Sequence, residues 1–217
     1  CTSCQKKIKK SFNSGYCYTC FRTLPETDIC QVKPELCHFH QGTCRDSQWG
    51  KDHCMISHTV YLAESSHLKV GITRSRRQKT RWMEQGALQA VPILYTKNRL
   101  DAGLAEVELK KAFSDKTNWR KMLTTQLPSQ DLIKVKKSLH SFLPKHLLDQ
   151  VVDEPVCVFR YPVSKMPDKI KSVNLEKNPD FSGRLCGIKG QYLVFEDSVL
   201  NMRKYKGYQL SFDIESL

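Results

Sequence analysis

The pattern of hydrophobic and polar positions predicts regular elements in the middle of the chain. The predicted strands are 59–63, 68–72 and 90–96, and the first two form a hairpin around a short polar loop. The predicted helices are one capped by Thr80, then 101–113 capped by Asp101, 130–141 and 144–150. Pro92 favours an edge position or a strand end for the third strand, because proline cannot donate to a sheet.

The two ends of the chain have different patterns. After about residue 152, short apolar stretches alternate with turn signals, which is typical of a small barrel or curled sheet. These stretches are 156–161, 185–188, 191–195, 199–202 and 208–214. The first 58 residues are rich in turns and metal-ligating side chains, with little periodicity. We therefore expect an α+β protein with a cysteine-rich module at 1–58, a small antiparallel sheet with helices at 59–152, and a small β domain at 153–217.

Eight of the ten cysteines lie in the first 54 residues. Cys1, Cys4, Cys17 and Cys20 have the spacing C-x2-C-x12-C-x2-C, which predicts a zinc ribbon with four thiolate ligands. Four thiolates close a tetrahedral site, so this ion is expected to be structural. A disulfide interpretation needs an oxidising compartment, and no secretion signal supports one. We expect a cytoplasmic protein.

A second cysteine series is less diagnostic. Cys30, Cys37, Cys44 and Cys54 are spaced C-x6-C-x6-C-x9-C and predict a second zinc site, with an iron–sulfur cluster as the alternative. Histidines lie among these cysteines and could replace one thiolate. They are His38, His40, His53 and His58. Cys157 and Cys186 lie in apolar contexts and are expected to be small buried side chains.

The positive charge is concentrated in the middle of the chain. The net charge is +13, and residues 59–127 hold thirteen cations against six anions. Within 73–81 there are five cations and no acidic residue. Such clustering favours binding to a phosphate backbone over a merely solvated loop, although DNA and RNA are not distinguished. The expected nucleic-acid contacts are Arg74, Arg76, Arg77 and Lys79. No apolar run approaches the roughly 20 residues of a membrane span, so no membrane partner is expected.

Residues 59–118 resemble the GIY-YIG nuclease domain. Thr59-Val60-Tyr61 and Lys69-Val70-Gly71 correspond to the two tripeptides of that family. Arg81-Trp82 matches its catalytic arginine at the start of a helix, Glu106 its metal-binding glutamate, and Asn118 a following asparagine. The sequence departs from the family at Thr59, at Lys69 and at Gln85, where many members have a histidine. Nearly the whole chain also resembles an uncharacterised bacterial family that joins cysteine-rich zinc modules to a GIY-YIG-like domain.

The resemblance implies a metal-dependent endonuclease acting on DNA or structured RNA. One Mg²⁺ or Mn²⁺ on Glu106 would act as a Lewis acid, and Arg81 would stabilise charge on the phosphate. Tyr61 could position or deprotonate water if its pKa were lowered, and Lys69 could do the same or bind phosphate. The alternative is a nucleic-acid-binding protein with a silent centre, in which Glu106 only pairs with Lys110 four residues later.

Overall fold

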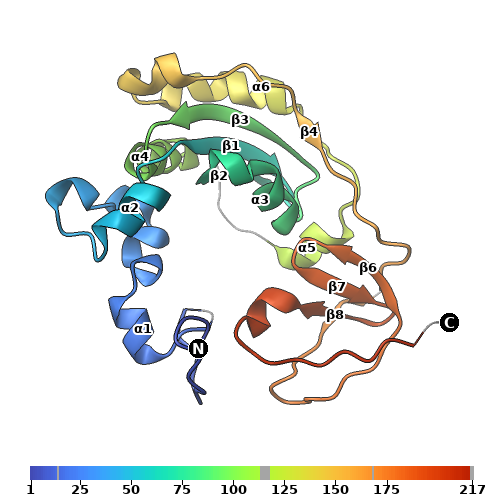
Figure 1. The fold of residues 1–217 in the computed structure, drawn as a ribbon. Coiled ribbons are helices and arrows are strands. Elements are labelled where there is room, and N and C mark those ends of the chain that lie inside the picture. Colours follow the sequence, from blue (N-terminus) through green and yellow to red (C-terminus); the bar gives the residue numbers. More distant parts are fainter. Residues whose placement is uncertain (14, 113–117, 168, 216–217) are drawn as a thin grey trace.

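The computed structural model spans the chain and describes all residues except 14, 113–117, 168 and 216–217. Two four-stranded sheets form its framework, and short helical turns form the N-terminal part (Figure 1). The fold is α+β, as expected.

The central sheet has the strand order β2–β1–β3–β4 and is antiparallel throughout. Its strands are β1 (His58–Glu64), β2 (Leu68–Arg74), β3 (Gln89–Thr96) and β4 (Cys157–Val158). The predicted hairpin is confirmed, since β1 pairs with β2 from His58↔Arg74 to Glu64↔Leu68. The short strand β4 extends this sheet, although the hydrophobic pattern groups it with the C-terminal stretches.

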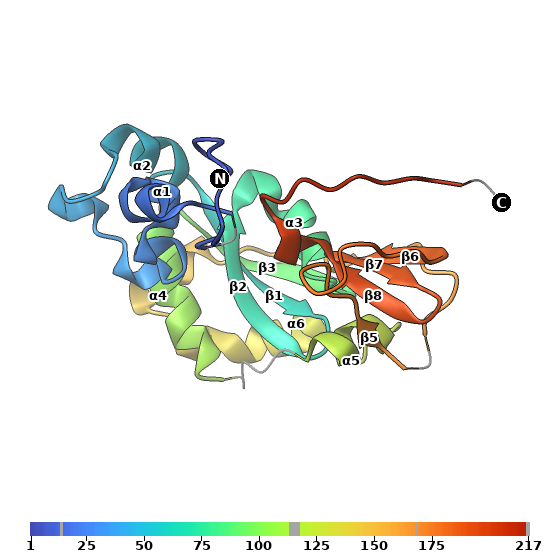
Figure 2. The same ribbon diagram turned by 90° about the horizontal axis from the view of Figure 1, so that it is seen from below.

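Alternation along β1 separates two apolar layers. Val60 and Leu62 pack on the face that is covered by α4 (Arg99–Lys110) and α6 (Leu132–Ser138). Tyr61 and Ala63 point to the opposite face, where Trp82 of α3 (Gln78–Glu84) covers them. Figure 2 shows α3 and α6 on opposite sides of the sheet. Because successive side chains of a strand alternate in direction, Tyr61 necessarily shares its face with α3.

Pro92 does not mark an edge. Strand β3 lies between β1 and β4, so it is not an edge strand, and Pro92 is not at its end; β4 pairs only with Gln89 and Ala90, so Pro92 has no β4 partner. The register shifts here, with Val60 opposite Leu94 and Tyr61 opposite Pro92. A bulge tolerates a proline inside a sheet because the ladder of hydrogen bonds is already interrupted there.

Several helices begin or end at other residues than the sequence predicts. Helix α4 begins after Asn98, whose side-chain oxygen accepts the Asp101 backbone N–H at 2.9 Å, so Asp101 is not the cap. Thr80 lies inside α3, not before it. Residues 145–150 form a 3-10 helix, η7 (Lys145–Gln150), after Pro144. The region predicted as 130–141 divides into α6 and η6 (Leu139–Phe142).

The C-terminal sheet is open, with the order β5–β8–β7–β6 and not a closed barrel. Its elements are β5 (Lys171–Ser172), β6 (Leu185–Lys189), β7 (Tyr192–Phe195) and β8 (Ser198–Asn201), followed by η8 (Met202–Tyr205). No strand forms over 208–214, all of which the structure describes. Helix α5 (Trp119–Thr124) packs on this sheet: Trp119 stacks on Tyr192 with ring centroids 5.7 Å apart.

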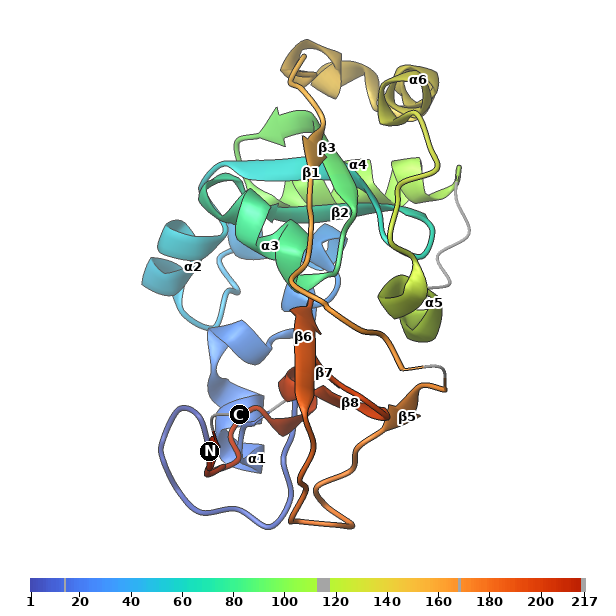
Figure 3. The same ribbon diagram turned by 90° about the vertical axis from the view of Figure 1, so that its right-hand side faces the viewer.

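The N-terminal part is built from short turns, as its sequence predicts. Its elements are α1 (Tyr18–Thr23), η1 (Pro25–Thr27), η2 (Ile29–Gln31), η3 (Pro34–Leu36), η4 (Phe39–Gln41) and α2 (Ser47–His53). It docks on α4 at Gly103, where a Cβ atom would lie 2.4 Å from the Glu35 nitrogen. Figure 3 shows the first residues beside the C-terminal sheet and away from the central sheet.

Two further expectations concern membranes and single cysteines. Within the described part of the chain, no helix has the length and hydrophobicity needed to cross a bilayer. Cys186 is buried, as expected, whereas Cys157 is only partly buried and packs against the Trp82 layer.

His58 at the start of β1 is expected to make the protein acid-sensitive. Its ring is fully buried, its Nδ1 donates to the Ile56 carbonyl at 2.8 Å, and burial lowers its pKa to about 4. The unfolded chain has a higher histidine pKa, so it binds more protons than the folded protein between about pH 6.5 and 4. Stability should therefore fall as the pH is lowered through this window, by about 2–3 kcal/mol at pH 4.5.

The test compares urea unfolding of the wild type and His58→Asn at pH 7 and 4.5. Asparagine does not titrate in this range, so the variant should lose less stability on acidification. Equal losses in both proteins would show that His58 does not cause the effect.

Candidate functional site

The first cysteine cluster can bind a metal ion. The ligand atoms of Cys1, Cys4, Cys17 and Cys20 all lie within 4.8 Å of one another, and the Cys4 and Cys17 sulfur atoms are 3.9 Å apart. A tetrahedral site with Zn–S bonds of 2.3 Å separates its sulfur atoms by about 3.8 Å, so the donor set fits zinc. The Cys20 backbone N–H donates to the Cys17 sulfur at 3.4 Å and lowers the pKa of that thiol. This turn therefore favours a thiolate at the position of a ligand.

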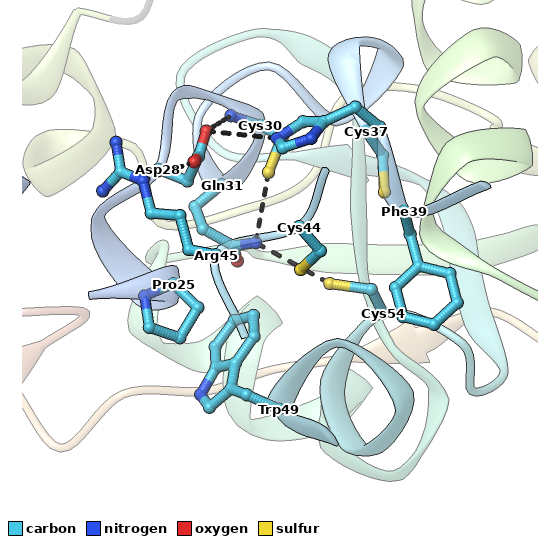
Figure 4. Close-up of a pocket in the computed structure, with 11 residues that line it drawn as sticks. Pro25, Asp28, Cys30, Gln31, Cys37, Phe39, Cys44, Arg45, Trp49 and Cys54 are labelled. Atoms are coloured by element: carbon cyan, nitrogen blue, oxygen red, sulfur yellow. Dashed lines mark hydrogen bonds and ion pairs between the residues drawn. The ribbon is translucent and has the colours of Figure 1, made fainter. Parts of the chain in front are cut away.

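The second cysteine series lines one small enclosed cavity (Figure 4). Cys30, Cys37, Cys44 and Cys54 come from η2, from the residue after η3, from the loop after η4, and from the end of α2. Three of these thiols, those of Cys30, Cys37 and Cys54, are buried. The cavity volume is about 10 Å³, which is small enough for a single ion or water.

The donor atoms that meet in this cavity differ from the predicted set. Asp28, Cys30 and His38 have ligand atoms within 4.8 Å of one another and could bind a metal ion. The Asp28 carboxylate also pairs with Arg45 at 2.7 Å and faces the His38 ring at 3.7 Å. Asp28 was not among the sequence candidates, because a single aspartate outside the cysteine spacing carries no signal.

Hydrogen bonds also connect thiols of the cavity to Gln31 and to one another. The Gln31 amide donates to the sulfur atoms of Cys30 and Cys54 at 3.8 and 3.7 Å. A hydrogen bond from Cys54 lowers the pKa of the Cys37 thiol to about 6. Among the four candidate histidines, His38 is the one within the donor group. His53 instead stacks on Trp49, and its Nδ1 contacts the Trp49 carbonyl at 2.9 Å.

Tyr61 and Arg81, two of the candidate catalytic residues, meet through Gln85. In the amide orientation that satisfies both neighbours, the Gln85 oxygen accepts from Arg81 Nε and Nη2 at 3.1 Å each. The Gln85 nitrogen then donates to the Tyr61 hydroxyl at 2.8 Å. Gly71 makes room for this group, since a Cβ atom there would lie 2.6 Å from the tyrosine hydroxyl. Gln85 thus links α3 to β1.

The environment of Tyr61 does not favour its use as a base. Its side chain is almost completely buried, and this burial raises its pKa to about 12. The Arg81 cation and the Gln85 hydrogen bond act in the opposite direction but are weaker, and the Glu106 carboxylate raises the pKa further. The lowered pKa that deprotonation requires is therefore not found.

Glu106 lies on α4, whose apolar side packs on the face of the central sheet opposite Tyr61, and it is mostly buried. Its link to Tyr61 is the effect of its charge on the Tyr61 pKa. Its carboxylate pairs with Lys110 at 3.2 Å, the helical ion pair that its sequence spacing permits. Burial raises the pKa of Glu106, Lys110 lowers it, and Glu35 of η3 raises it. Glu35 thus places a second carboxylate charge near Glu106, from a part of the sequence that gives no hint of it.

The remaining candidates take different positions. Lys69 pairs with Ala63 in the register of β1 and β2, and therefore shares the sheet face of Tyr61. Asn118 caps α5 by accepting the Lys121 N–H at 3.1 Å, so its side chain has a structural task. Thr59, at the family's glycine position, donates to Gln78 Oε1 at 3.2 Å.

The predicted nucleic-acid contacts lie immediately before Arg81. Arg74 ends β2, and Arg76 and Arg77 form η5 (Ser75–Arg77), which leads directly into α3. Arg77 pairs with Glu84 at 3.7 Å, while Arg81 pairs with the same glutamate at 3.8 Å. Arg76, Arg77 and Lys79 are exposed, so cations reach the solvent beside the Tyr61–Gln85–Arg81 group.

The fold and these sites define an α+β protein with two four-stranded sheets and an N-terminal cysteine cluster that can hold a metal ion. A family model described as "Protein of unknown function (DUF2797)" matches residues 1–210, and the chain belongs to that family. No curated protein and no solved structure matches the chain.

Proposed function

We propose that this protein binds nucleic acid and cleaves its phosphodiester bonds at a GIY-YIG-type centre formed by Tyr61, Arg81 and Glu106. The hydrogen-bonded group of Tyr61, Gln85 and Arg81, within electrostatic reach of Glu106, carries the proposal. These residues come from β1, α3 and α4, and they occupy the positions that match the family motif.

Arg81 is the residue best placed to hold a phosphate. About one third of its side chain is exposed, and Gln85 occupies Nε and one terminal nitrogen. The remaining nitrogen, Nη1, faces Glu84 at 3.8 Å, and a phosphate oxygen that replaces this exposed contact would bind there and receive stabilisation of the charge that develops during cleavage. Gln85 fixes the guanidinium plane, so this positioning costs little side-chain entropy when substrate binds.

Glu106 is the candidate ligand for a divalent ion. A hard cation such as Mg²⁺ takes one or two carboxylates and completes its shell with water and substrate phosphate, so the donor chemistry fits. When bound, the ion would supply Lewis-acid activation of the phosphate. Glu106 must exchange its contact with Lys110 for this ligand. Tyr61 keeps its proton at neutral pH and acts as a hydrogen-bonding group.

We further propose that zinc is the structural ion of the Cys1–Cys4–Cys17–Cys20 cluster. For the second site we propose zinc on Asp28, Cys30 and His38, with one neighbouring thiol of the cavity as the fourth ligand. The alternative is that Cys30, Cys37, Cys44 and Cys54 bind zinc or an iron–sulfur cluster. In that case Asp28 and His38 are not needed for metal binding. Metal analysis and absorption spectra of Asp28→Asn and His38→Gln separate these possibilities.

A binding protein with a silent centre is the second candidate. The Glu106–Lys110 ion pair and the burial of the Tyr61 hydroxyl favour it, because both groups are satisfied without substrate. In that case the central cations hold nucleic acid and no bond is broken.

Substitution of the centre distinguishes the two functions. With Mg²⁺ or Mn²⁺ and a panel of plasmid, duplex, single-stranded and structured RNA substrates, Glu106→Gln and Arg81→Lys should each lower cleavage at least about 100-fold. Glu108→Gln on the exposed side of the same helix is the matched control and should stay within about twofold of the wild type.

Cleavage that survives both Glu106→Gln and Arg81→Lys excludes this centre. Wild-type protein that binds nucleic acid in a salt-sensitive way without cutting any substrate supports the silent centre instead.

A further inference from the structure

Three cationic segments that are far apart in sequence lie on one connected part of the molecule. We call them the ribbon loop, with Lys6, Lys7, Lys9 and Lys10; the α3 segment, with Arg74, Arg76, Arg77, Lys79 and Arg81; and the η8 segment, with Arg203, Lys204 and Lys206. Nearly all of these side chains are exposed, and Arg74 and Arg81 are half-buried. From the sequence, Arg203 and Lys204 could extend a basic surface on the C-terminal domain, but the sequence does not place them beside the other two segments.

The ribbon contacts the end of the η8 segment a few residues after its cationic loop, at Gly15 and Tyr16. A Cβ atom at Gly207 would lie 3.1 Å from the Gly15 Cα, and one at Gly15 would lie 3.0 Å from the Lys206 carbonyl oxygen. Both glycines have positive φ, which L side chains rarely adopt. The Lys206 ammonium also lies 5.5 Å from the centre of the Tyr16 ring. Two backbones therefore pack closely across about 190 residues of sequence.

The η8 segment is in turn tied to α3 through the C-terminal sheet. The turn between β6 and β7 packs on the end of α3, where a Cβ atom at Gly190 would lie 3.1 Å from the Glu84 carbonyl oxygen. The Tyr161 hydroxyl donates to the Ala87 carbonyl at 2.8 Å. Lys189 Nζ donates to the Leu123 carbonyl of α5 at 3.2 Å.

On its other side the ribbon is tied to the central sheet. Arg45 donates to the Leu24 carbonyl at 2.9 Å, which joins the ribbon to the second cysteine-rich part. Arg99 of α4 joins that part to the central sheet, because its backbone N–H donates to the Cys54 carbonyl at 2.8 Å. These contacts form a closed ring that connects the ribbon, the C-terminal sheet, α3 and the central sheet, and leads back to the ribbon through the second cysteine-rich part. In Figure 1, α1, α3 and the turn after β8 border the same central region.

We propose that the ribbon loop, the α3 segment and the η8 segment form one nucleic-acid-binding surface, with the first cysteine cluster holding the ribbon loop in place. This inference rests on the proposed nucleic-acid binding, and it assigns the ribbon and the C-terminal sheet to the same bound strand as Arg81. Acidic side chains offset only part of the charge. Glu84 pairs with Arg77 and Arg81, and Glu176 pairs with Lys204 at 3.5 Å.

Charge reversal in each outer segment tests the surface. Lys6→Glu with Lys7→Glu changes the ribbon loop, and Arg203→Glu with Lys206→Glu changes the η8 segment. Lys134→Glu with Lys137→Glu on α6, across the central sheet from α3, is the matched control. Binding of fluorescent single-stranded and duplex oligonucleotides of graded length is measured by anisotropy at several KCl concentrations, after metal content and circular dichroism confirm that each variant is folded.

Each outer pair should weaken binding of long oligonucleotides at least about tenfold and reduce the salt slope by about two, while the control stays within about twofold. The loss of affinity should be smaller for oligonucleotides that are too short to reach beyond the α3 segment. Gly207→Val, which disrupts the Gly15 contact without changing charge, should also weaken binding of the long oligonucleotides.

The outcomes separate this inference from the proposed function. If both outer double variants bind like the wild type while an Arg76→Glu, Arg77→Glu variant binds weakly, the extended surface is overturned and the proposed nucleic-acid binding stands. Wild-type protein that binds no oligonucleotide, or binds only vesicles of acidic lipid, overturns both.

Discussion

Cys17→Ser is expected to abolish the metal binding proposed for the first cysteine cluster and to unfold the ribbon segment that ends with α1 while the two sheets stay folded. Helix α1 in this segment has no buried residue, so apolar packing gives it little stability. Structural zinc sites supply about 10–16 kcal/mol of apparent binding free energy in small peptides, far more than such a segment can replace. Metal content should fall by one equivalent, and hydrogen exchange should become fast in the ribbon alone.

Cys157→Ser provides the matched control for this prediction. Cys157 packs against the Trp82 layer and lies in neither metal-ligand group, so its variant should keep the full metal content. Unchanged metal content in Cys17→Ser, or loss of exchange protection throughout both sheets, would contradict the prediction. Cys17→Ser is also expected to release the Gly15–Gly207 contact, because the turn that the proposed metal ion would hold positions Gly15.

Trp82→Ala is expected to lower the free energy of unfolding by about 3–5 kcal/mol. Trp82 has no exposed surface and contacts the Tyr61 and Phe159 rings edge-on, with centroids 5.7 and 6.2 Å apart. Its removal leaves a cavity between α3 and the central sheet. Because Tyr61 packs on this ring, any cleavage activity should fall together with stability.

Denaturant unfolding of Trp82→Ala, Trp82→Phe and Met83→Ala tests the assignment. Phenylalanine retains part of the packing and removes an indole N–H that has no hydrogen-bond partner in the described structure, so its cost should be smaller. Met83, the next residue of the same helix, is 45% exposed and should cost less than about 1 kcal/mol. Similar losses for Trp82→Ala and Met83→Ala would show that the buried layer is not an important source of stability.

Local patterns predict much of the central sheet. Strands β1 and β2 follow from alternation around a short loop, and α4 follows from its apolar spacing. The exact helix starts are less predictable, because Asn98 and Asp101 are both good caps and tertiary packing selects between them. The position of Pro92 depends on a bulge between β1 and β3, and the pairing of β4 depends on a segment sixty residues further along the chain.

The candidate sites divide in the same way. The first cysteine cluster is predictable because each two-residue gap brings a pair of thiols together within one turn. The second site combines Asp28, Cys30 and His38 through the packing of three short turns, which cysteine spacing does not encode. Gln85 and Glu35 likewise gain their significance only from the neighbours that the fold brings to them.

The sequence by itself determined the α+β class, the hairpin, the four-thiol cluster and the concentration of positive charge before Arg81. These features depend on residues close together in the chain, where spacing alone fixes geometry. Only the tertiary structure decided that Tyr61 is buried under Gln85 and Arg81, that Glu35 lies near Glu106, and that segments near the two ends of the chain meet at Gly15 and Gly207. Those contacts arise from packing between distant elements, and burial raises the pKa of Tyr61 and of Glu106.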